Sequence, residues 1–241
     1  MEYGIQLYSV RDLAEQNFEG ALCTVASLGY RYVEFAGFFG HSAEEVKAML
    51  ARYGLAVSGA HVGCGELAKD QIEETVAYHK AIGNNSLIIP WSNVSTRENL
   101  DALIDCINYA KPILDAAGIT LGYHNHDFEL VSTSFGVVPF DELEARTEVF
   151  FEIDTYWAYA AGLDPIALLE RLGDRVSVIH LKDGLAGGEG RALGEGTAPV
   201  LAVREYARDH GLLAVVESED CNPTGAEEIA RCMKFLKSLE E

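Results

Sequence analysis

Short apolar runs alternate with longer amphipathic segments along the whole chain. The apolar runs are rich in Val, Ile, Leu and aromatic residues, and most are continuous, which is typical of strands buried on both faces of a parallel sheet. The segments between them show helical periodicity. The expected strands are Gly4–Tyr8, Tyr30–Ala36, Ala56–His61, Ser86–Pro90, Ile119–His124, Val149–Asp154, Val176–Leu181 and Leu213–Glu217.

The segments between the strands carry start and stop signals for helices. Ser42 and Glu45 have the spacing of a capping box, and Pro165 suits the first turn of a helix, where no amide donor is needed. Gly54 and Gly211 follow helical segments and precede strands, as C-terminal stops do. Strands and helices that alternate in this way predict an α/β fold with right-handed parallel crossovers. Eight such units favour closure into a (β/α)8 TIM barrel.

The chain is expected to form one domain over residues 1–241. No low-complexity tract, block of like charge or Pro/Gly/Ser linker divides it, and a barrel of about 250 residues commonly forms a single domain. A doubly wound open sheet is the alternative. However, no G-x-G-x-x-G motif follows the first expected strand, as a dinucleotide site on such a sheet would require.

Nearly every expected strand ends in a polar or ionisable residue. Because a barrel gathers the C-terminal ends of all its strands on one face, these residues should converge on a single pocket. They are Tyr8, Glu34, His61, Trp91, the run His124-Asn125-His126, Asp154, His180 and Glu217.

Three of these strand ends predict a metal site. Asp154, His180 and Glu217 each follow an apolar run, and burying such charges without partners is costly. A shared divalent cation removes that cost. Mixed oxygen and nitrogen ligation suits one Mn²⁺ ion, our first expectation, and also Mg²⁺, Co²⁺ or Zn²⁺. The fourth ligand is expected to be His124, with His126 as the alternative.

Charge and cysteine usage narrow the class of protein. The formal net charge is −20, which opposes binding to nucleic acids and to anionic membranes, since both present negative charge. The five cysteines form no C-x-x-C pair, as expected in a reducing compartment. The N-terminus lacks the pattern of a signal peptide. We therefore expect a cytoplasmic protein.

Several motifs resemble one known family. They are Tyr123-His124-Asn125-His126-Asp127-Phe128-Glu129, Asp154-Thr155-Tyr156-Trp157, His180-Leu181-Lys182-Asp183, Gly194-Glu195-Gly196, Val216-Glu217, Gly59-Ala60-His61 and the opening Gln6-Leu7-Tyr8-Ser9-Val10-Arg11. In this order they look like the signature of the sugar phosphate isomerase/epimerase family of xylose isomerase-like TIM barrels. The resemblance covers essentially the whole chain.

The resemblance implies a metal held by Glu, Asp, His and Glu, with the two glutamates exchanging the substrate proton in relatives that epimerise ketoses. Asp154, His180 and Glu217 match three of these ligands, but His124 stands where the first glutamate is expected. The second proton-transfer group must then be a histidine, or the reaction is an elimination. We expect Glu217 to bind the metal and relay a proton, with His126 as the second catalytic residue.

The expected reaction is metal-dependent isomerisation or epimerisation of a sugar or sugar phosphate. A metal bound to adjacent hydroxyl and carbonyl oxygens acidifies the C–H between them and stabilises the enediolate. The alternative is a carbon–oxygen lyase or dehydratase that acts on a keto-sugar or keto-inositol. A non-catalytic sugar-binding barrel is a third reading. An endonuclease, also a branch of this superfamily, is opposed by the negative charge.

Other residues on the same face are expected to contact the carbohydrate substrate. Carboxylates and imidazoles bond sugar hydroxyls, indole rings pack on sugar faces, and cations bind carbonyl, carboxylate or phosphate oxygens. The candidates are Glu34, His61, Trp91, Trp157, Lys182 and Arg191. Arg191 lies in the glycine-rich segment 184–196, which is expected to be a mobile loop over the site. Apolar residues on outer helices would also allow a homo-oligomer.

Overall fold

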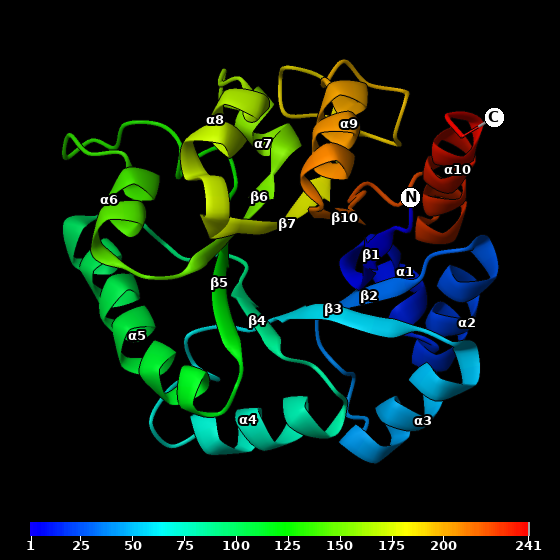
Figure 1. Ribbon diagram of the computed structural model, residues 1–241, viewed down its shortest axis with the longest axis horizontal. Helices are drawn as coiled ribbons and strands as arrows, with labels where there is room; N and C mark the ends of the chain where they lie inside the picture. The colour runs from blue at the N-terminus through cyan, green and yellow to red at the C-terminus, as the bar shows by residue number, and fades with distance from the viewer. Residues whose placement is uncertain (241) are drawn as a thin grey trace.

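Eight parallel strands close into a barrel in the computed structural model, which describes residues 1–240 (Figure 1). The last strand of the barrel pairs with both β7 and β1 and so completes the ring. The barrel strands are β1 (Gly4–Gln6), β2 (Tyr32–Phe35), β3 (Ala56–His61), β4 (Ser86–Ile89), β5 (Thr120–His124), β6 (Phe150–Asp154), β7 (Val176–Leu181) and β10 (Leu213–Val216). The predicted (β/α)8 TIM barrel is therefore confirmed.

Helices surround the barrel on its outside (Figure 1). They are α1 (Arg11–Ala14), α2 (Phe18–Leu28), α3 (Ala43–Tyr53), α4 (Ile72–Ala81), α5 (Arg97–Ala116), α6 (Pro139–Arg146), α7 (Thr155–Ala160), α8 (Pro165–Leu172), α9 (Val200–His210) and α10 (Gly225–Ser238). Short 3-10 turns cover Leu7–Val10 and Gly173–Arg175. Within residues 1–240, no helix has the length and apolar character needed to cross a bilayer.

The first strand is shorter than the sequence pattern predicts. It ends at Gln6, because the following residues turn into the 3-10 helix Leu7–Val10. The side chain of Gln6 caps this turn by accepting a hydrogen bond of 3.0 Å from the backbone N–H of Tyr8. Tyr8 consequently lies in this 3-10 helix, 45% exposed, instead of at a strand end.

The helix signals in the sequence act as expected. Both hydrogen bonds of the Ser42–Glu45 capping box are present at the start of α3. Gly54 ends the same helix with φ of 65°, a left-handed conformation that disfavours residues with a Cβ. Pro165 begins α8, where its missing N–H costs nothing.

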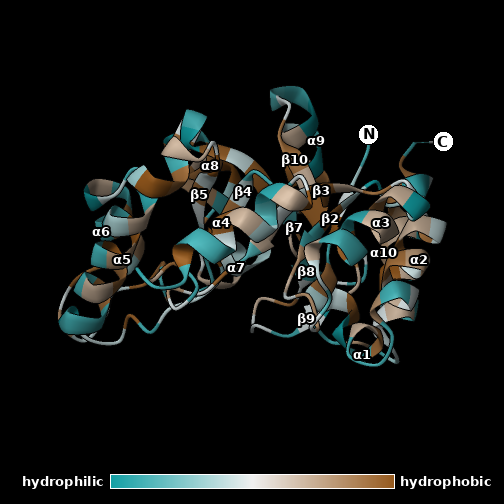
Figure 2. Ribbon diagram, turned by 90° about the horizontal axis from the view of Figure 1, so that it is seen from below, coloured by the Kyte–Doolittle hydropathy of each residue, from teal (hydrophilic) through white to brown (hydrophobic). Residues whose placement is uncertain are grey.

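The hydrophobic core fills the layer between the sheet and the helices. Figure 2 shows apolar residues concentrated in the central strands and hydrophilic residues on the outer faces of the helices. Ile5 and Val33 of the barrel, and Leu22 and Ile107 of the helices, are fully buried in this layer. The interior of the barrel also holds charged side chains, and these build the site described below.

The two termini lie at one end of the barrel and a small hairpin lies at the other (Figure 2). The hairpin pairs β8 (Asp183–Gly184) with β9 (Gly190–Arg191) and follows β7. The buried carboxylate of Asp183 accepts hydrogen bonds from four backbone N–H groups. Gly184, Gly194 and Gly196 belong to the segment expected to be mobile, and Ala198 lies just after it. This segment is therefore tied to the barrel at both ends.

Candidate metal and catalytic site

The four predicted metal ligands meet at the C-terminal face of the barrel. His124, Asp154 and His180 lie in β5, β6 and β7, and Glu217 follows β10 directly. Each offers one ligand atom, and these atoms all lie within 4.8 Å of one another. All four side chains are buried. The strand register contributes to this convergence, because Asp154 and His180 are paired residues of neighbouring strands.

Two of these side chains have atoms that need a further partner. Asp154 Oδ1 accepts a hydrogen bond of 2.9 Å from the backbone N–H of Trp157 and so caps α7, but Oδ2 is buried without a partner. His124 Nδ1 is also buried without a hydrogen bond. The ammonium group of Lys182 lowers the pKa of Asp154, but burial has the larger effect and raises this pKa to about 7. A cation would remove both penalties.

The orientation of His180 also fits a metal ligand. Its Nε2 lies 2.8 Å from Glu34 Oε1, so this nitrogen carries the hydrogen and donates it. Its Nδ1 then faces Glu217 Oε2 at 3.2 Å, and two acceptors this close need a proton or a cation between them. The charges of Glu152 and Glu217 hold the pKa of His180 well above its usual value despite burial. The raised pKa favours a proton on Nδ1, and a divalent ion would take the place of that proton.

A second group of charged residues lies deeper in the barrel, and we call it the inner cluster: Glu34, His61, Glu152 and His180. Each imidazole contacts both carboxylates. His61 Nε2 lies 3.1 Å from Glu34 and 2.9 Å from Glu152. The corresponding distances from His180 Nε2 are 2.8 and 3.2 Å. His180 thus belongs to both groups and connects the metal site to the buried carboxylates.

The inner cluster shares protons among its members. Burial and the Glu34 carboxylate raise the pKa of Glu152 to about 8. As the pH falls, Glu152 therefore takes up a proton before Glu34 does. Although burial opposes it, the charges of His180 and His61 hold the pKa of Glu34 well below its usual value. The same carboxylates raise the pKa of His61 to about 9 against the effect of burial. His61 is therefore a cation at neutral pH.

Local irregularities of the sheet make room for the two inner carboxylates. The register between neighbouring strands shifts beside Glu34 and beside Glu152, as at a β-bulge. Gly59 lies opposite Glu34, and a Cβ there would come within 3.4 Å of Glu34 Oε2 and 2.7 Å of Ile88. Gln6 adds a hydrogen bond of 2.7 Å to Glu34 Oε1.

A cavity of about 520 Å³ opens above the metal ligands. It is lined by six of the residues that we predicted from the strand ends: Tyr8, His61, Trp91, His124, His126 and Glu217. The rest of its lining is Ala36, Gly37, Glu66, Pro90 and Glu219. Tyr8 was predicted only as a strand end, and Glu66 and Glu219 were not predicted because both lie in loops without a motif.

His126 presents a neutral imidazole to this cavity. Its backbone N–H donates a hydrogen bond of 2.9 Å to Glu129, and its ring stacks on Phe128 with centroids 5.5 Å apart. Burial lowers the pKa of its side chain to about 4. Its Nδ1 has no hydrogen-bond partner. The hydrogen bond fixes the backbone and Phe128 orients the ring, while one nitrogen stays free to accept a proton.

The other predicted substrate contacts lie outside the cavity wall. Glu34 is fully buried in the inner cluster. Lys182 is buried between carboxylates, 2.7 Å from Glu219 and 3.4 Å from Glu217, and the ring of Trp157 covers its ammonium group at 4.7 Å. Arg191 pairs with Glu189 in the β8–β9 hairpin.

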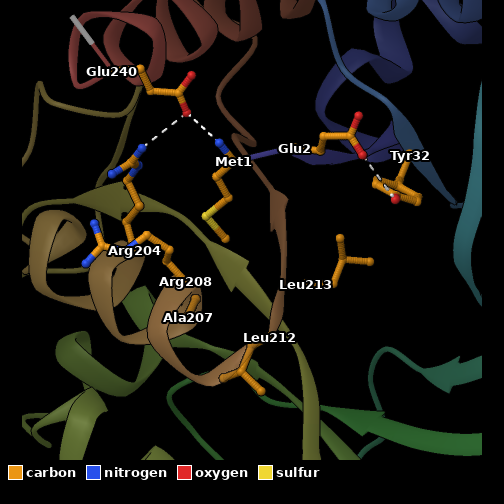
Figure 3. Close-up of a pocket in the computed structure, with 10 residues that line it drawn as sticks. Met1, Glu2, Tyr32, Arg204, Ala207, Arg208, Leu212, Leu213 and Glu240 are labelled. Atoms are coloured by element: carbon orange, nitrogen blue, oxygen red, sulfur yellow. Dashed lines mark hydrogen bonds and ion pairs between the residues drawn. The ribbon is translucent and has the colours of Figure 1, made fainter.

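A larger cavity, of about 640 Å³, lies at the opposite end of the barrel. There the carboxylate of Glu240 joins the amino group of Met1 at 2.9 Å and the guanidinium of Arg204 at 3.2 Å (Figure 3). Within residues 1–240, the groupings of metal-binding side chains all lie elsewhere. Because TIM barrels build their active sites at the C-terminal face, the smaller cavity is the functional candidate.

Comparison with known sequences identifies the family of the chain. The model of a family described as xylose isomerase-like TIM barrel matches residues 23–239. A curated inosose dehydratase from Geobacillus kaustophilus (strain HTA426) is 26% identical over 186 residues, which cover 67% of this chain and 60% of that protein. The matched region therefore spans less than two thirds of the relative.

Solved structures share the fold over nearly the whole chain. A sugar phosphate isomerase/epimerase from Parabacteroides distasonis ATCC 8503 superposes with a TM-score of 0.82 and 25% identity, covering 98% of this chain and 97% of that one. A probable 3-DHS dehydratase from Bacillus anthracis has a TM-score of 0.76 and 12% identity, covering 98% and 99% of the two chains. The second likeness is one of fold alone.

We expect the protein to retain about one Mn²⁺ ion per chain after incubation and desalting, and Asp154→Asn to retain none, because it removes the unpartnered Oδ2 carboxylate. Asparagine also caps helices well, so α7 should persist. Elemental mass spectrometry measures the metal, and circular dichroism checks the fold. The control is Asp174→Asn, an exposed aspartate outside the site. Wild-type metal content in Asp154→Asn would contradict the ligand assignment.

We expect Glu34→Gln to weaken Mn²⁺ binding about 10–100-fold without unfolding the barrel, as loss of a carboxylate behind a ligand histidine typically does. The charge of Glu34 fixes the hydrogen on His180 Nε2 and leaves Nδ1 for the metal. Competition with a fluorescent chelator gives the affinity. Glu205→Gln, on the exposed face of α9, is the matched control. Equal affinities in the two variants would show that Glu34 does not position His180.

Proposed function

Because the chain belongs to the xylose isomerase-like TIM barrel family, we propose that it is a metal-dependent enzyme that isomerises or epimerises a sugar. The observation that carries this proposal is the meeting of four metal-binding side chains next to one cavity, which Glu217, one of the four, and His126 both line as proton-transfer candidates. The sugar phosphate isomerase/epimerase fold and the family match are consistent with it.

A divalent ion in this site would polarise adjacent carbonyl and hydroxyl oxygens of the substrate and acidify the C–H group between them. The residues of the chain would then move the proton. Glu217 is suited to take it, because the charges of Lys182 and His180 keep its pKa well below the usual value in spite of burial. Its carboxylate is therefore ionised at neutral pH and lies on the cavity wall.

His126 is our proposal for the second proton-transfer group. The family resemblance implies a glutamate at the place of His124, and the imidazole there is uncharged because burial and the charge of His180 hold its pKa well below normal. His126 lies beside it, with ring centroids 5.1 Å apart, and lines the cavity. Proton transfer would then run between a carboxylate and a neutral imidazole.

A dehydratase is the second candidate, and two observations favour it. One is the likeness to an inosose dehydratase over two thirds of this chain. The other is His61, a cation at neutral pH that lines the cavity. An elimination needs a base for the proton next to the carbonyl and an acid for the departing hydroxyl. Glu217 and His61 would fill these roles.

An exchange experiment separates the proposals. Mn²⁺-loaded protein is incubated in deuterium oxide with a panel of ketoses and keto-inositols, and the products are followed by NMR. Deuterium at the carbon next to the carbonyl, in an isomer or epimer of the substrate, supports the first proposal. A product that has lost water supports the dehydratase. Saturable sugar binding without exchange, in protein shown to hold metal, would exclude both.

We expect His126→Ala to keep its metal but to lose turnover by about 10²–10⁴-fold, the usual contribution of a general acid or base. His210→Ala, at the exposed end of α9, is the control and should keep both. Metal content and initial rate are measured on the same samples. Loss of metal in His126→Ala would reassign His126 as a ligand, and an unchanged rate would remove it from the mechanism.

A further inference from the structure

A second hollow adjoins the catalytic cavity on the same face of the barrel. It has a volume of about 540 Å³, and it is formed by the loop after β4 and the loop after β5. Trp91 lines both hollows. Phe128 lines the second hollow and stacks on His126, which lines the first. The two hollows thus share Trp91, and Phe128 links them through its stacking on His126. We call the second hollow the aryl groove.

The aryl groove is mostly apolar and carries no charged side chain among the described residues that line it. Trp91 is 57% exposed and Val131 is 44% exposed, so two apolar side chains of one groove face solvent together. Val94 and Phe128 contribute further apolar surface. The remaining lining is uncharged and polar: Ser92, Asn93, Ser95, Ser132, Thr133 and Ser134. Such a surface suits an apolar group in contact with water at its edge.

Arginine and lysine side chains are absent from the described lining of both hollows, and the imidazolium of His61 in the catalytic cavity is held between the carboxylates of Glu34 and Glu152. The neighbouring cations are already engaged. Lys182 is buried among carboxylates, and the guanidinium of Arg11 donates to the backbone carbonyls of Tyr8 and Glu219. Arg97, near the groove, pairs with Glu142 at 3.0 Å.

The catalytic cavity instead carries negative charge at its wall. Glu66, Glu217 and Glu219 all line it. A phosphate ester would face these carboxylates without an arginine or lysine to bind it, although phosphate recognition commonly relies on such cations. An uncharged sugar avoids this repulsion.

We infer that the substrate is an uncharged sugar that bears an apolar substituent, with the sugar in the metal cavity and the substituent in the aryl groove against Trp91. This inference rests on the proposed function, whose substrate class it narrows. An aromatic substituent fits best, because it can stack on the exposed indole of Trp91 and the ring of Phe128. The sugar ring then lies beneath it at the metal ligands.

The test follows ligand binding at the two tryptophans of the chain. Protein labelled with fluorinated tryptophan gives one NMR resonance for each, and Trp91→Phe assigns them. The probes are phenol, phenyl glucoside, methyl glucoside and glucose phosphate. We expect phenol to shift the Trp91 resonance even without metal. We expect phenyl glucoside to bind at least about tenfold tighter than methyl glucoside, or about 1.4 kcal/mol.

A matched pair of variants isolates the groove. Val131→Asp places a carboxylate in the groove at an exposed position, and we expect it to abolish the phenol shift. Leu201→Asp makes the same change at an exposed leucine on α9 and should preserve the shift. An unmoved Trp91 resonance with phenol and phenyl glucoside would overturn the inference, as would tighter binding of glucose phosphate than of methyl glucoside.

Light scattering tests whether a second copy of the chain, instead of a ligand, occupies the aryl groove. If a second copy of the chain covers Trp91, then Trp91→Ala should convert a dimer to a monomer, and this result would also overturn the inference. The metal and exchange experiments stay separate from this test, because phenol binding in the groove requires no metal. Metal-dependent exchange without phenol binding would count against the aryl groove alone. Phenol binding in a protein that never retains metal would count against the proposed function.

Discussion

The contact of His180 with the two buried carboxylates, Glu34 and Glu152, is the interaction by which the barrel interior holds charged side chains without water. Closing eight strands into a ring removes water from their inner face, so each charge placed there needs a partner. The inner cluster meets this need by alternating imidazoles and carboxylates at 2.8 to 3.2 Å. Removing one partner of such a pair typically costs about 3–5 kcal/mol. These residues thus bear on stability as well as on function.

The same contact determines what His180 offers to the metal site. With its Nε2 hydrogen directed at Glu34, the ring can present only Nδ1 toward Glu217 and Asp154. A metal ligand fixed in this way loses little freedom when the ion binds, because the orientation is already set by the fold. The inner cluster therefore orients a ligand of the candidate metal site. The two groups of charges are better regarded as one structure than as separate features.

Much of this could be predicted from the sequence, because barrel geometry turns a linear pattern into a spatial one. Eight apolar runs that end in polar residues are sufficient to predict a common face, and this is how His124, Asp154, His180 and Glu217 were brought together in advance. Glu152 was missed although a signal existed: it precedes Asp154 by two positions in an otherwise apolar strand, and side chains at that spacing share a face. A buried glutamate in such a run should be treated as part of the site.

The remaining differences had no signal in the sequence. Glu219 and Glu66 reach the cavity from loops, whose paths depend on tertiary packing. Lys182 sits two residues after His180 and was expected to contact substrate, yet three carboxylates gather around its ammonium group. Whether a cation near an active site binds substrate depends on how many anions the fold places beside it, and distant strands contribute those anions.

The replacement of a ligand glutamate by His124 has a consequence for the charge of the whole site. Three anionic ligands would hold a divalent ion with an excess of negative charge, whereas Asp154 and Glu217 together neutralise it. The buried ammonium of Lys182 is balanced in turn by Glu219, 2.7 Å away, so the centre is close to neutral instead of negative. A centre of this kind stabilises negative charge that develops on a substrate oxygen when a neighbouring proton leaves. His124 thus strengthens the site for proton abstraction. It also removes one of the two carboxylates that would exchange the proton symmetrically. This asymmetry is common to both proposed reactions.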